Sequence, residues 1–243
     1  MKKSIALVII DTSQQVLANN ALSHSLKMLD FQQILIYSDD QKHWPFNQII
    51  EIQPLENLTE YNKIIIRDIA FKIHTDYCLV IQYDGFIINK EQFSPHFYHY
   101  DYIGAPWPHF ATLNVGNGGF SWRSRKLIEV VASLPNDDFS VAEDIFICRQ
   151  QRPLLEQSHG IVFAPPAIAS HFSIEAIPVP FPTFGFHGIF HLPQIYRNSI
   201  DFLLENLSHS SACKWQHMLL PAFEKISPAA ANRFKERLSS QDH

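Results

Sequence analysis

The chain of 243 residues carries a formal net charge of −5, and 46% of its residues are hydrophobic while 18% are charged. This composition excludes a disordered chain and provides enough core for one α/β domain, with or without a C-terminal extension. The negative charge argues against a nucleic-acid groove, and no apolar run approaches the roughly 18 to 20 residues that cross a bilayer.

The start of the chain imitates a signal peptide, because Met1-Lys2-Lys3 precedes the apolar run Ile5–Ile10. The run ends at Asp11, however, and no small-x-small cleavage site follows, so we predict a first strand instead. Three widely spaced cysteines form no CxxC pair, which fits a reducing compartment: Cys78, Cys148 and Cys213. We therefore expect a cytoplasmic protein, with the inner face of the cytoplasmic membrane as a further location.

The first third of the chain alternates between predicted strands and helices. Strands are predicted at Ser4–Ile10, Gln33–Tyr37, Ile49–Ile52 and Tyr77–Ile81. Helices are predicted from caps at Asp11-Thr12-Ser13 to about Leu29, and from a cap at Thr59 through Ile73. This alternation predicts a mostly parallel sheet with helices on both faces. Because no GxGxxG follows the first strand, a dehydrogenase-type dinucleotide fold loses its main signature.

The strand Tyr77–Ile81 is nearly unbroken apolar sequence, so we expect it to be buried on both faces. It ends in Gln82-Tyr83-Asp84-Gly85, which places a carboxylate at the carboxyl end of a central strand, where ligands bind in open α/β sheets. The apolar run Phe86-Ile87-Ile88 then predicts another strand. An Asp-Gly pair between two strands is also the commonest hairpin signal, so a turn and a ligand site explain Asp84 equally well.

The middle of the chain is less regular. Asp101–Trp107 predicts a short strand ending in a rigid loop, and Asn114–Phe120 holds three glycines within four positions. These glycines let a backbone approach a ligand closely, although a tight bulge also explains them. Ser121-Trp122-Arg123 predicts a strand, and Ser124 caps a predicted helix from Arg125 to Ser133.

Glu143 and Asp144 open a predicted helix whose next residues are Ile-Phe-Ile. Adjacent carboxylates in a first turn are favoured by the helix dipole whatever their role, but the apolar continuation predicts a buried helix whose acidic start faces a cleft. Strands are predicted at Ile161–Ala164 and His171–Glu175. His187 follows between two glycines; a lone histidine among aromatic residues is more often structural than a ligand, and its spacing from His191 lacks HExxH.

The last fifty residues predict helices at Ile195–Leu207 and within Trp215–Leu238, where apolar and basic residues mix. Such a tail could lie on a membrane surface near a lipid-linked acceptor. Packing against the domain explains it better, since Pro221 and Pro228 interrupt the apolar stripe. We predict a domain over residues 1–193 and a helical extension packed on it over residues 194–243, and the sequence does not indicate an oligomeric state.

Five blocks in this order resemble a bacterial family catalogued as a domain of unknown function, which is similar to GT-A-type nucleotide-sugar glycosyltransferases. The resemblance covers roughly residues 5–191, and its blocks are QYDG (82–85), YDYIGAPW (100–107), VGNGGFSWRSR (115–125), AEDIF (142–146) and FGFHG (184–188). It implies a GT-A-like, Rossmann-like single α/β domain and an inverting transfer of sugar from a nucleotide-sugar, most often a UDP-sugar. The implied acceptor is a glycan or lipid-linked glycan in cell-surface polysaccharide or lipooligosaccharide synthesis.

The resemblance also implies roles for individual residues. Asp84 stands at the metal-binding place of the DxD motif, where Mn²⁺ or Mg²⁺ joins a carboxylate to the donor diphosphate, and His187 matches a late histidine that completes the metal site. Gln82 replaces the first Asp of DxD, which weakens metal binding. Glu143-Asp144 matches the acidic pair that includes the general base; of the two catalytic candidates we choose Asp144 as the base, with Glu143 fixing the loop or the acceptor.

The remaining assignments concern donor and acceptor contacts. For the donor we assign Asp11, Thr12, Arg67, Gln82, Tyr83, Asp84, Gly116, Asn117, Gly118 and Gly119, and for the acceptor Trp107 and Phe120. If no metal is used, Arg123 and Arg125 are the candidates to pair with the diphosphate. The alternative function is a non-catalytic module that binds a sugar or a nucleotide with the same fold.

Overall fold

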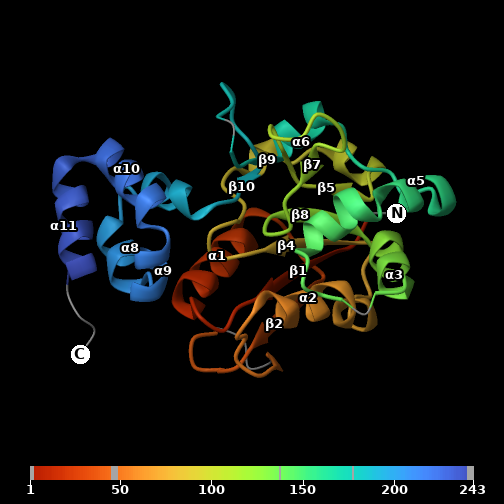
Figure 1. Cartoon of the computed structure of the whole chain (residues 1–243), viewed down its shortest axis with the longest axis horizontal. Coiled ribbons are helices and arrows are strands. Elements are labelled where there is room, and N and C mark those ends of the chain that lie inside the picture. The colour runs from red at the N-terminus through yellow and green to blue at the C-terminus, as the bar shows by residue number, and fades with distance from the viewer. Residues whose placement is uncertain (1–2, 45–48, 137, 177, 240–243) are drawn as a thin grey trace.

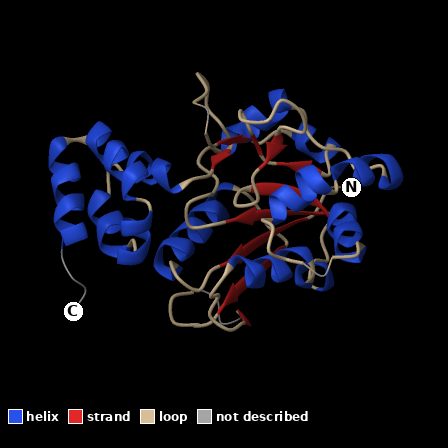
Figure 2. Ribbon diagram, viewed as in Figure 1, coloured by secondary structure: helices blue, strands red, loops and turns tan. Residues whose placement is uncertain are grey.

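The protein is an α/β domain with a group of helices at one end, as seen in the computed structural model, which describes residues 3–44, 49–136, 138–176 and 178–239. A central sheet is flanked by helices on both faces, and the last helices gather beside it (Figures 1 and 2). Among the described residues, no helix is both long and apolar enough to span a membrane.

The central sheet has six strands within the described residues, in the order β3-β2-β1-β4-β8-β5. Neighbours from β3 to β4 are parallel, whereas β8 is antiparallel to both β4 and β5. The strands are β1 (Ile5–Ile10), β2 (Gln33–Ser38), β3 (Ile50–Glu51), β4 (Tyr77–Ile81), β5 (Tyr102–Ile103) and β8 (Ser121–Ser124). Two short ladders lie beside the sheet: β6 (Ala105–Pro106) with β7 (Val115–Gly116), and β9 (Ser173–Ile174) with β10 (Gly185–Phe186).

The helices are α1 (Gln15–Met28), α2 (Leu58–Ile66), α3 (Arg125–Ser133), α4 (Glu143–Ile145), α5 (Arg152–His159), α6 (Pro166–Phe172), α7 (Leu192–Ile195), α8 (Ile200–Asn206), α9 (His209–Lys214), α10 (Gln216–Ile226) and α11 (Pro228–Ser239). A π-helical turn, Phe146–Gln150, continues α4, and short 3₁₀ turns occur at Asp68–Phe71, Lys90–Gln92, Pro95–His99 and Ile189–His191.

Strand β1 shows why both faces of the sheet carry helices, since all six of its residues are buried. Ala6, Val8 and Ile10 face a core shared with α2 and α3. Residues 5, 7 and 9 alternate to the other face and join a core shared with α1 and α6. The predicted mostly parallel sheet with helices on both faces is confirmed, because a strand that is apolar at every position must be covered twice.

Element boundaries agree with the prediction where local chemistry is strong. The predicted first, second, third and fourth strands are confirmed to within one residue at each end, and α3 begins after Ser124, whose hydroxyl accepts from the N–H of Leu127. Helix α2, in contrast, is capped by Asn57, whose side chain accepts from Glu60 N–H, so the cap predicted at Thr59 was wrong. At α1 the Asp11 carboxylate binds the N–H groups of Ser13 and Gln14 just before the helix.

Three predicted strands were wrong in part or in whole. Residues 86–88 make an isolated bridge from Ile87 to Gly185, and residues 161–164 make one from Phe163 to Tyr102. Residues 171 and 172 end α6, so only Ser173–Ile174 of the segment predicted at 171–175 is strand. These short apolar runs serve as buried connections, and periodicity alone cannot separate such runs from strands.

The C-terminal helices share a core with the domain. Leu203, Leu219 and Phe234 belong to the same buried cluster as Leu17 of α1 and Phe86. The side-chain amide of Gln14, before α1, donates to Ser208 and Ser211 in and before α9. Helices α8 to α11 therefore pack on the α1 side of the domain (Figure 1). They are shorter and more numerous than predicted, because helical structure is interrupted between residues 207 and 208 and at Ser227-Pro228.

Candidate active site

Asp84 lies on a tight turn at the carboxyl end of β4. The N–H of Gln82 donates to the carbonyl of Gly85 at 2.8 Å, and the N–H of Gly85 donates to the carbonyl of Gln82 at 3.1 Å. The carbonyl of Asp84 accepts from the N–H of Gly188 at 2.8 Å, which ties this turn to the loop after β10. The turn predicted from the Asp-Gly pair is confirmed, and it places Asp84 at the carboxyl edge of the sheet, where the ligand site stays a prediction.

His187 lies beside Asp84. The distance from His187 Nε2 to Asp84 Oδ1 is 3.8 Å, while His187 Nδ1 is 3.3 Å from Glu175 Oε1. Burial alone would lower the pKa of His187, but the carboxylates of Asp84 and Glu175 outweigh it and raise the pKa above its ordinary value. Asp84 Oδ1 is buried and has no hydrogen-bond partner among the described residues.

Asp84 and His187 lie close enough together to contact one divalent ion. Ligand atoms each about 2.1 Å from one ion lie up to about 4.2 Å apart, so the observed 3.8 Å fits. Within the described ranges no three or more His, Cys, Asp or Glu residues are grouped to hold a metal, so other oxygens would have to complete the shell. The orphaned Asp84 oxygen and the imidazole are suited to Mn²⁺ or Mg²⁺ held jointly with a diphosphate.

Gln82, at the first position of the DxD-like turn, has a different task from a carboxylate. Its Oε1 lies 3.2 Å from His187 Nε2, and its Nε2 donates to the hydroxyl of Tyr61 on α2 at 2.9 Å. Without an ion, a protonated His187 Nε2 donates to this oxygen and the side chain holds the imidazole in place, so Nε2 must lose that proton before it can bind an ion; the Gln side chain brings no negative charge. This explains how a Gln can occupy the position.

Glu143 and Asp144 have separate environments. Glu143 is 3% exposed, and its Oε1 accepts from Arg123 Nη2 at 2.8 Å, with Arg123 itself 1% exposed. Asp144 is half-buried; its Oδ2 accepts from Gly118 N–H at 3.2 Å and its Oδ1 from Ile145 N–H at 2.8 Å. Only Asp144 of the two keeps a carboxylate at the surface of the site, because Glu143 is enclosed by its ion pair.

The glycine loop differs from what we expected. Residues 116–119 are all buried, and the space beside each glycine holds a protein side chain. A Cβ on Gly116 would overlap the Trp107 ring, one on Gly118 would lie 1.6 Å from Glu143 Oε1, and one on Gly119 would lie 2.2 Å from His187 Nε2. The glycines therefore admit Glu143 and His187 to the backbone, and Asn117, at φ 79°, shapes the turn by accepting from the N–H groups of residues 119 and 120.

The acceptor contacts assigned to Trp107 and Phe120 were wrong, because both rings are buried. Trp107 is 5% exposed and fills the space beside Gly116, and Phe120 is fully buried among Phe172, Phe184 and Gly185. These aromatic residues build the core under the loop and offer no face to a ligand.

The arginines assigned to phosphate or donor contacts are also occupied elsewhere. Arg67 donates to the carbonyls of Ala132, Leu134 and Asn136 and so ties the end of α3 to α2. Arg123 is enclosed with Glu143, and Arg125 pairs with Glu129 at the amino end of β4, on the opposite edge of the sheet from Asp84. None of the three reaches the site around Asp84, which corrects these assignments.

Asp11, Thr12 and Tyr83 stay near the carboxyl edge. Thr12 Oγ1 accepts from Leu55 N–H and lines a cavity of about 280 Å³ with Asp39, Asp40 and His43, at the ends of β1 and β2. Tyr83 packs against the cluster that holds the C-terminal helices. Burial raises the pKa of Asp11 to about 6; the N–H groups of Gln14 and Ser13 oppose this, and Asp84 and Asp39 reinforce it.

Asp11→Asn should stabilise the protein at pH 7.5. The gain, measured against the unchanged protein at the same pH, should be larger at pH 7.5 than at pH 4. The pKa of Asp11 in the folded state lies above its unfolded value of 3.8, so the stability it contributes is complete below pH 3.8 and is lost as pH rises through about 6. Asn keeps the accepting oxygen without the buried charge. Urea unfolding at the two pH values should show a gain at pH 7.5 of about 1 to 3 kcal/mol.

The control for Asp11→Asn is Asp76→Asn, where the sign is opposite. Hydrogen bonds from Ser4 lower the pKa of Asp76, so its contribution is present above its unfolded pKa and is lost as pH falls. Asp76→Asn should therefore lose stability at pH 7.5. An Asp11→Asn variant that is no more stable at pH 7.5 than the unchanged protein would contradict the burial of a charged Asp11.

Sequence reasoning missed three residues that organise the site. Glu175 binds His187, Tyr61 binds Gln82, and Asn62 of α2 accepts from Glu143 N–H while donating to the carbonyls of Phe139 and Val141. The available signals were a Tyr-Asn pair shortly before the apolar end of α2, Ile64–Ile66, and a Glu directly after a short strand. Their partners are far away in the sequence, so no spacing rule connects them.

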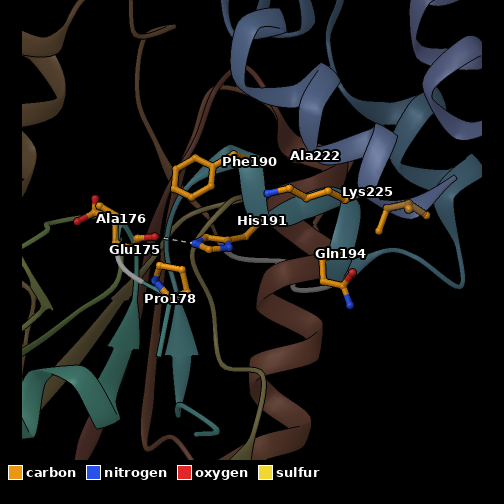
Figure 3. A pocket seen from close by; sticks show the side chains of 9 residues that line it. Glu175, Ala176, Pro178, Phe190, His191, Gln194, Ala222 and Lys225 are labelled. Carbon is orange, nitrogen blue, oxygen red and sulfur yellow. Dashed lines mark hydrogen bonds between the residues drawn. The ribbon is translucent and has the colours of Figure 1, made fainter. Parts of the chain in front are cut away.

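A separate cavity of about 340 Å³ is lined by Glu175, the turn at residues 189–191, α7 and α10. Figure 3 shows Lys225 reaching toward Phe190, with the His191 ring below it in this view. His191 Nε2 binds the backbone carbonyl of Glu175 at 2.9 Å, whereas the Glu175 carboxylate is turned away from this cavity (Figure 3).

A family model matches this sequence, and a solved structure supports the fold. The model of a family described as "Protein of unknown function (DUF5672)" matches residues 46–187. No curated protein has a significantly similar sequence. A glycosyltransferase involved in glycosylation of the major capsid of PBCV-1 superposes with a TM-score of 0.51 at 12% identity, over 76% of this chain and 93% of that chain.

A second solved structure is the mannosyltransferase PcManGT from Pyrobaculum calidifontis in complex with GDP-Man and Mn²⁺, with a TM-score of 0.47 and 10% identity over 98% of this chain and 75% of that chain. The expected GT-A-like fold, a mostly parallel sheet flanked by helices, is confirmed.

Proposed function

The chain belongs to the DUF5672 family, and we propose that it is a glycosyltransferase that moves a sugar from a nucleotide-sugar to a glycan or lipid-linked acceptor. The observation that carries the proposal is the buried, unpartnered Oδ1 of Asp84, which lies 3.8 Å from His187 Nε2 at the carboxyl edge of a GT-A-like sheet. A buried carboxylate oxygen without a partner is a candidate for binding an ion or a ligand, and Asp84 lies at the sheet edge where ligands bind in open α/β sheets.

The donor would span the carboxyl edge from β1 to β10. Its nucleoside would occupy the cavity beside Thr12, at the ends of β1 and β2, and its diphosphate would lie near Asp84 and His187. A bound Mn²⁺ or Mg²⁺ would neutralise charge on the departing diphosphate. A UDP-sugar remains our first choice of donor, since UDP is the commonest carrier among such enzymes.

Asp144 would act on the acceptor. In an inverting transfer the acceptor hydroxyl loses its proton as it attacks the anomeric carbon, so a carboxylate must be within hydrogen-bond reach. Asp144 is half-buried and is held by Gly118 N–H, and the adjacent Gly119 packs on His187. Gly118 and Gly119 thus connect the proposed base, Asp144, to the proposed metal ligand His187. The ion pair between Glu143 and Arg123 holds these residues in place.

The alternative, a binding module without catalysis, would need the same donor site but no free carboxylate for the acceptor. The half-buried state of Asp144 leaves part of its carboxylate open to an acceptor, which the enzyme requires and a binding module does not. We further propose that residues 1–193 carry the reaction and that the C-terminal helices extend the domain. Their contact with a membrane surface stays a prediction.

Asp84→Asn should abolish Mn²⁺-dependent binding of nucleoside diphosphates, because the amide cannot supply the anionic oxygen that the ion requires. Thermal shift with UDP and GDP, each with and without Mn²⁺, measures this directly, since a ligand stabilises the protein in proportion to the logarithm of its concentration over Kd. His187→Gln should weaken the same binding by roughly tenfold to a hundredfold.

Asp76→Asn, at the opposite edge of the sheet, is the matched control and should shift as the unchanged protein does. Unaltered Mn²⁺-dependent binding by Asp84→Asn would remove the metal site from the proposal. If no nucleoside diphosphate stabilises even the unchanged protein, the transferase itself is contradicted.

A further inference from the structure

One side chain of the C-terminal helices lines the cavity in which the donor nucleoside is proposed to bind. Asn206 is the last residue of α8, and it lines the cavity of about 280 Å³ together with Thr12, Asp39 and His43. Thr12 follows β1, while Asp39 and His43 follow β2. The carboxyl edge of the sheet therefore supplies one part of this cavity, and a helix far away in the sequence supplies another.

Hydrogen bonds hold the C-terminal helices against this edge of the sheet. Gln14 Oε1 accepts from Ser208 N–H at 3.1 Å, and the Gln14 amide donates to the hydroxyl groups of Ser208 and Ser211. Burial raises the pKa of Tyr83, and a hydrogen bond with the Ser211 side chain opposes this increase. Since Tyr83 precedes Asp84, the start of α9 contacts both the loop before α1 and the turn that carries the proposed metal ligand.

The cavity and the proposed metal site lie on either side of Asp11. The charges of Asp39 and Asp84 both contribute to raising the pKa of Asp11, so Asp11 is close to each of them. This agrees with the order of the strands, because β1 lies between β2 and β4 and all three are parallel. A ligand can therefore place one end beside Asp39 and the other beside Asp84.

The polar lining of the cavity suits a nucleoside better than a diphosphate. The described residues that line it include no Lys or Arg, and the carboxylates of Asp39 and Asp40 would repel a phosphate. Carboxylate, hydroxyl and amide groups can instead exchange hydrogen bonds with ribose hydroxyls and with the N–H and carbonyl groups of a base. Gln15 Nε2 donates to Asp39 Oδ1 at 2.6 Å, so this carboxylate is already held in place.

Asn206 can bind a ligand without losing the hydrogen bond that orients its side chain. Its Nδ2 donates to the carbonyl of Phe202, one turn earlier on α8, at 2.8 Å. Within the described residues Oδ1 has no hydrogen-bond partner, and it is not one of the buried polar atoms. The half-buried amide therefore offers a nucleoside one acceptor, Oδ1, and one further N–H donor.

We propose that Asn206 binds the nucleoside half of the donor, so that the C-terminal helices complete the donor site. The proposal rests on the proposed function, since it takes a nucleotide-sugar as the donor. The residues proposed to hold the metal and to accept the proton all lie before residue 194. The nucleoside site does not end there, because α8 provides one of its walls.

The test is Asn206→Leu in the full chain, which keeps the approximate size of the side chain and removes its hydrogen-bonding groups. It should weaken the binding of UDP or GDP with Mn²⁺ by roughly twofold to tenfold, the factor that one hydrogen bond contributes. Pyrophosphate with Mn²⁺ has no nucleoside and should bind the variant as tightly as it binds the unchanged protein. Isothermal titration calorimetry gives each Kd. Asn232→Leu, the same replacement at an exposed position of α11, is the matched control and should change neither Kd.

An unchanged Kd for the nucleotide in Asn206→Leu would overturn the role of Asn206 while the proposed function stands. Equal weakening of nucleotide and pyrophosphate, or the same loss in Asn232→Leu, would also overturn it, because the effect would then come from the fold and not from a contact with the nucleoside. If neither UDP nor GDP binds the unchanged protein, the proposed function itself fails, and this inference fails with it. Asn206→Ala replaces Asn206→Leu if that variant does not fold.

Discussion

Asp144→Asn should lower the rate of sugar transfer by roughly a hundredfold to ten-thousandfold and leave donor affinity nearly unchanged. Loss of a general base has an effect of this size, because the acceptor hydroxyl must then attack with its proton still bound. The amide keeps an oxygen that can accept from Gly118 or Ile145 N–H, so the loop should keep its position. Initial rates with saturating donor, together with Kd for the nucleotide, separate these effects.

Asp138→Asn is the matched control, since Asp138 is an exposed carboxylate whose side chain, within the described residues, accepts from the N–H of Ser140. It should transfer at the unchanged rate. Full activity of Asp144→Asn, or a product that retains the anomeric configuration of the donor, would contradict a single displacement assisted by Asp144.

Arg123→Met should destabilise the protein by about 3 to 5 kcal/mol, because it leaves the Glu143 carboxylate buried without its partner. Both side chains are almost completely enclosed, and their 2.8 Å contact is the one ion pair that Glu143 makes among the described residues. Burial raises the pKa of Glu143 and the Arg123 guanidinium opposes this, so removing the guanidinium favours protonation of the buried acid. Urea unfolding at pH 7.5 gives the change in the free energy of unfolding.

Arg125→Met provides the comparison, since Arg125 and Glu129 form an exposed pair on α3. Exposed pairs contribute about 0 to 1 kcal/mol, so this variant should unfold almost as the unchanged protein does. Arg123→Met combined with Glu143→Leu should recover part of the loss, because the unpaired charge is then gone. A loss below about 1 kcal/mol for Arg123→Met alone would show that water or another group compensates Glu143.

The sheet could be predicted from the sequence because its central strands are unbroken runs of apolar residues. The runs at Ile5–Ile10 and Tyr77–Ile81 are apolar at every position, and such strands have one stable environment, between two layers of helices. The position of Asp84 followed from the same signal, since a residue after a buried parallel strand must lie at the carboxyl edge. Cap residues were harder, because Asn57 and Thr59 are both good caps and only the structure decides between them.

The glycine loop could not be predicted correctly, because a glycine shows only that space is needed and not what fills it. At Gly118 and Gly119 the space holds Glu143 and His187, which come from later parts of the chain. The burial of Trp107 and Phe120 has the same origin, since aromatic residues beside a flexible loop fit a core and a sugar site equally well. The division of labour between Glu143 and Asp144 depended on Arg123, a partner that the sequence does not identify.

The most direct test of the account is the release of nucleoside diphosphate from a panel of UDP- and GDP-sugars, with Mn²⁺ and an acceptor glycoside, measured for the unchanged protein, Asp84→Asn and Asp144→Asn. The account predicts that at least one donor is consumed by the unchanged protein, that metal removal or Asp84→Asn stops both binding and release, and that Asp144→Asn stops release while binding persists. A protein that binds a nucleotide-sugar but releases no diphosphate from any donor, with its two variants indistinguishable from it, would contradict the transferase and support a binding module.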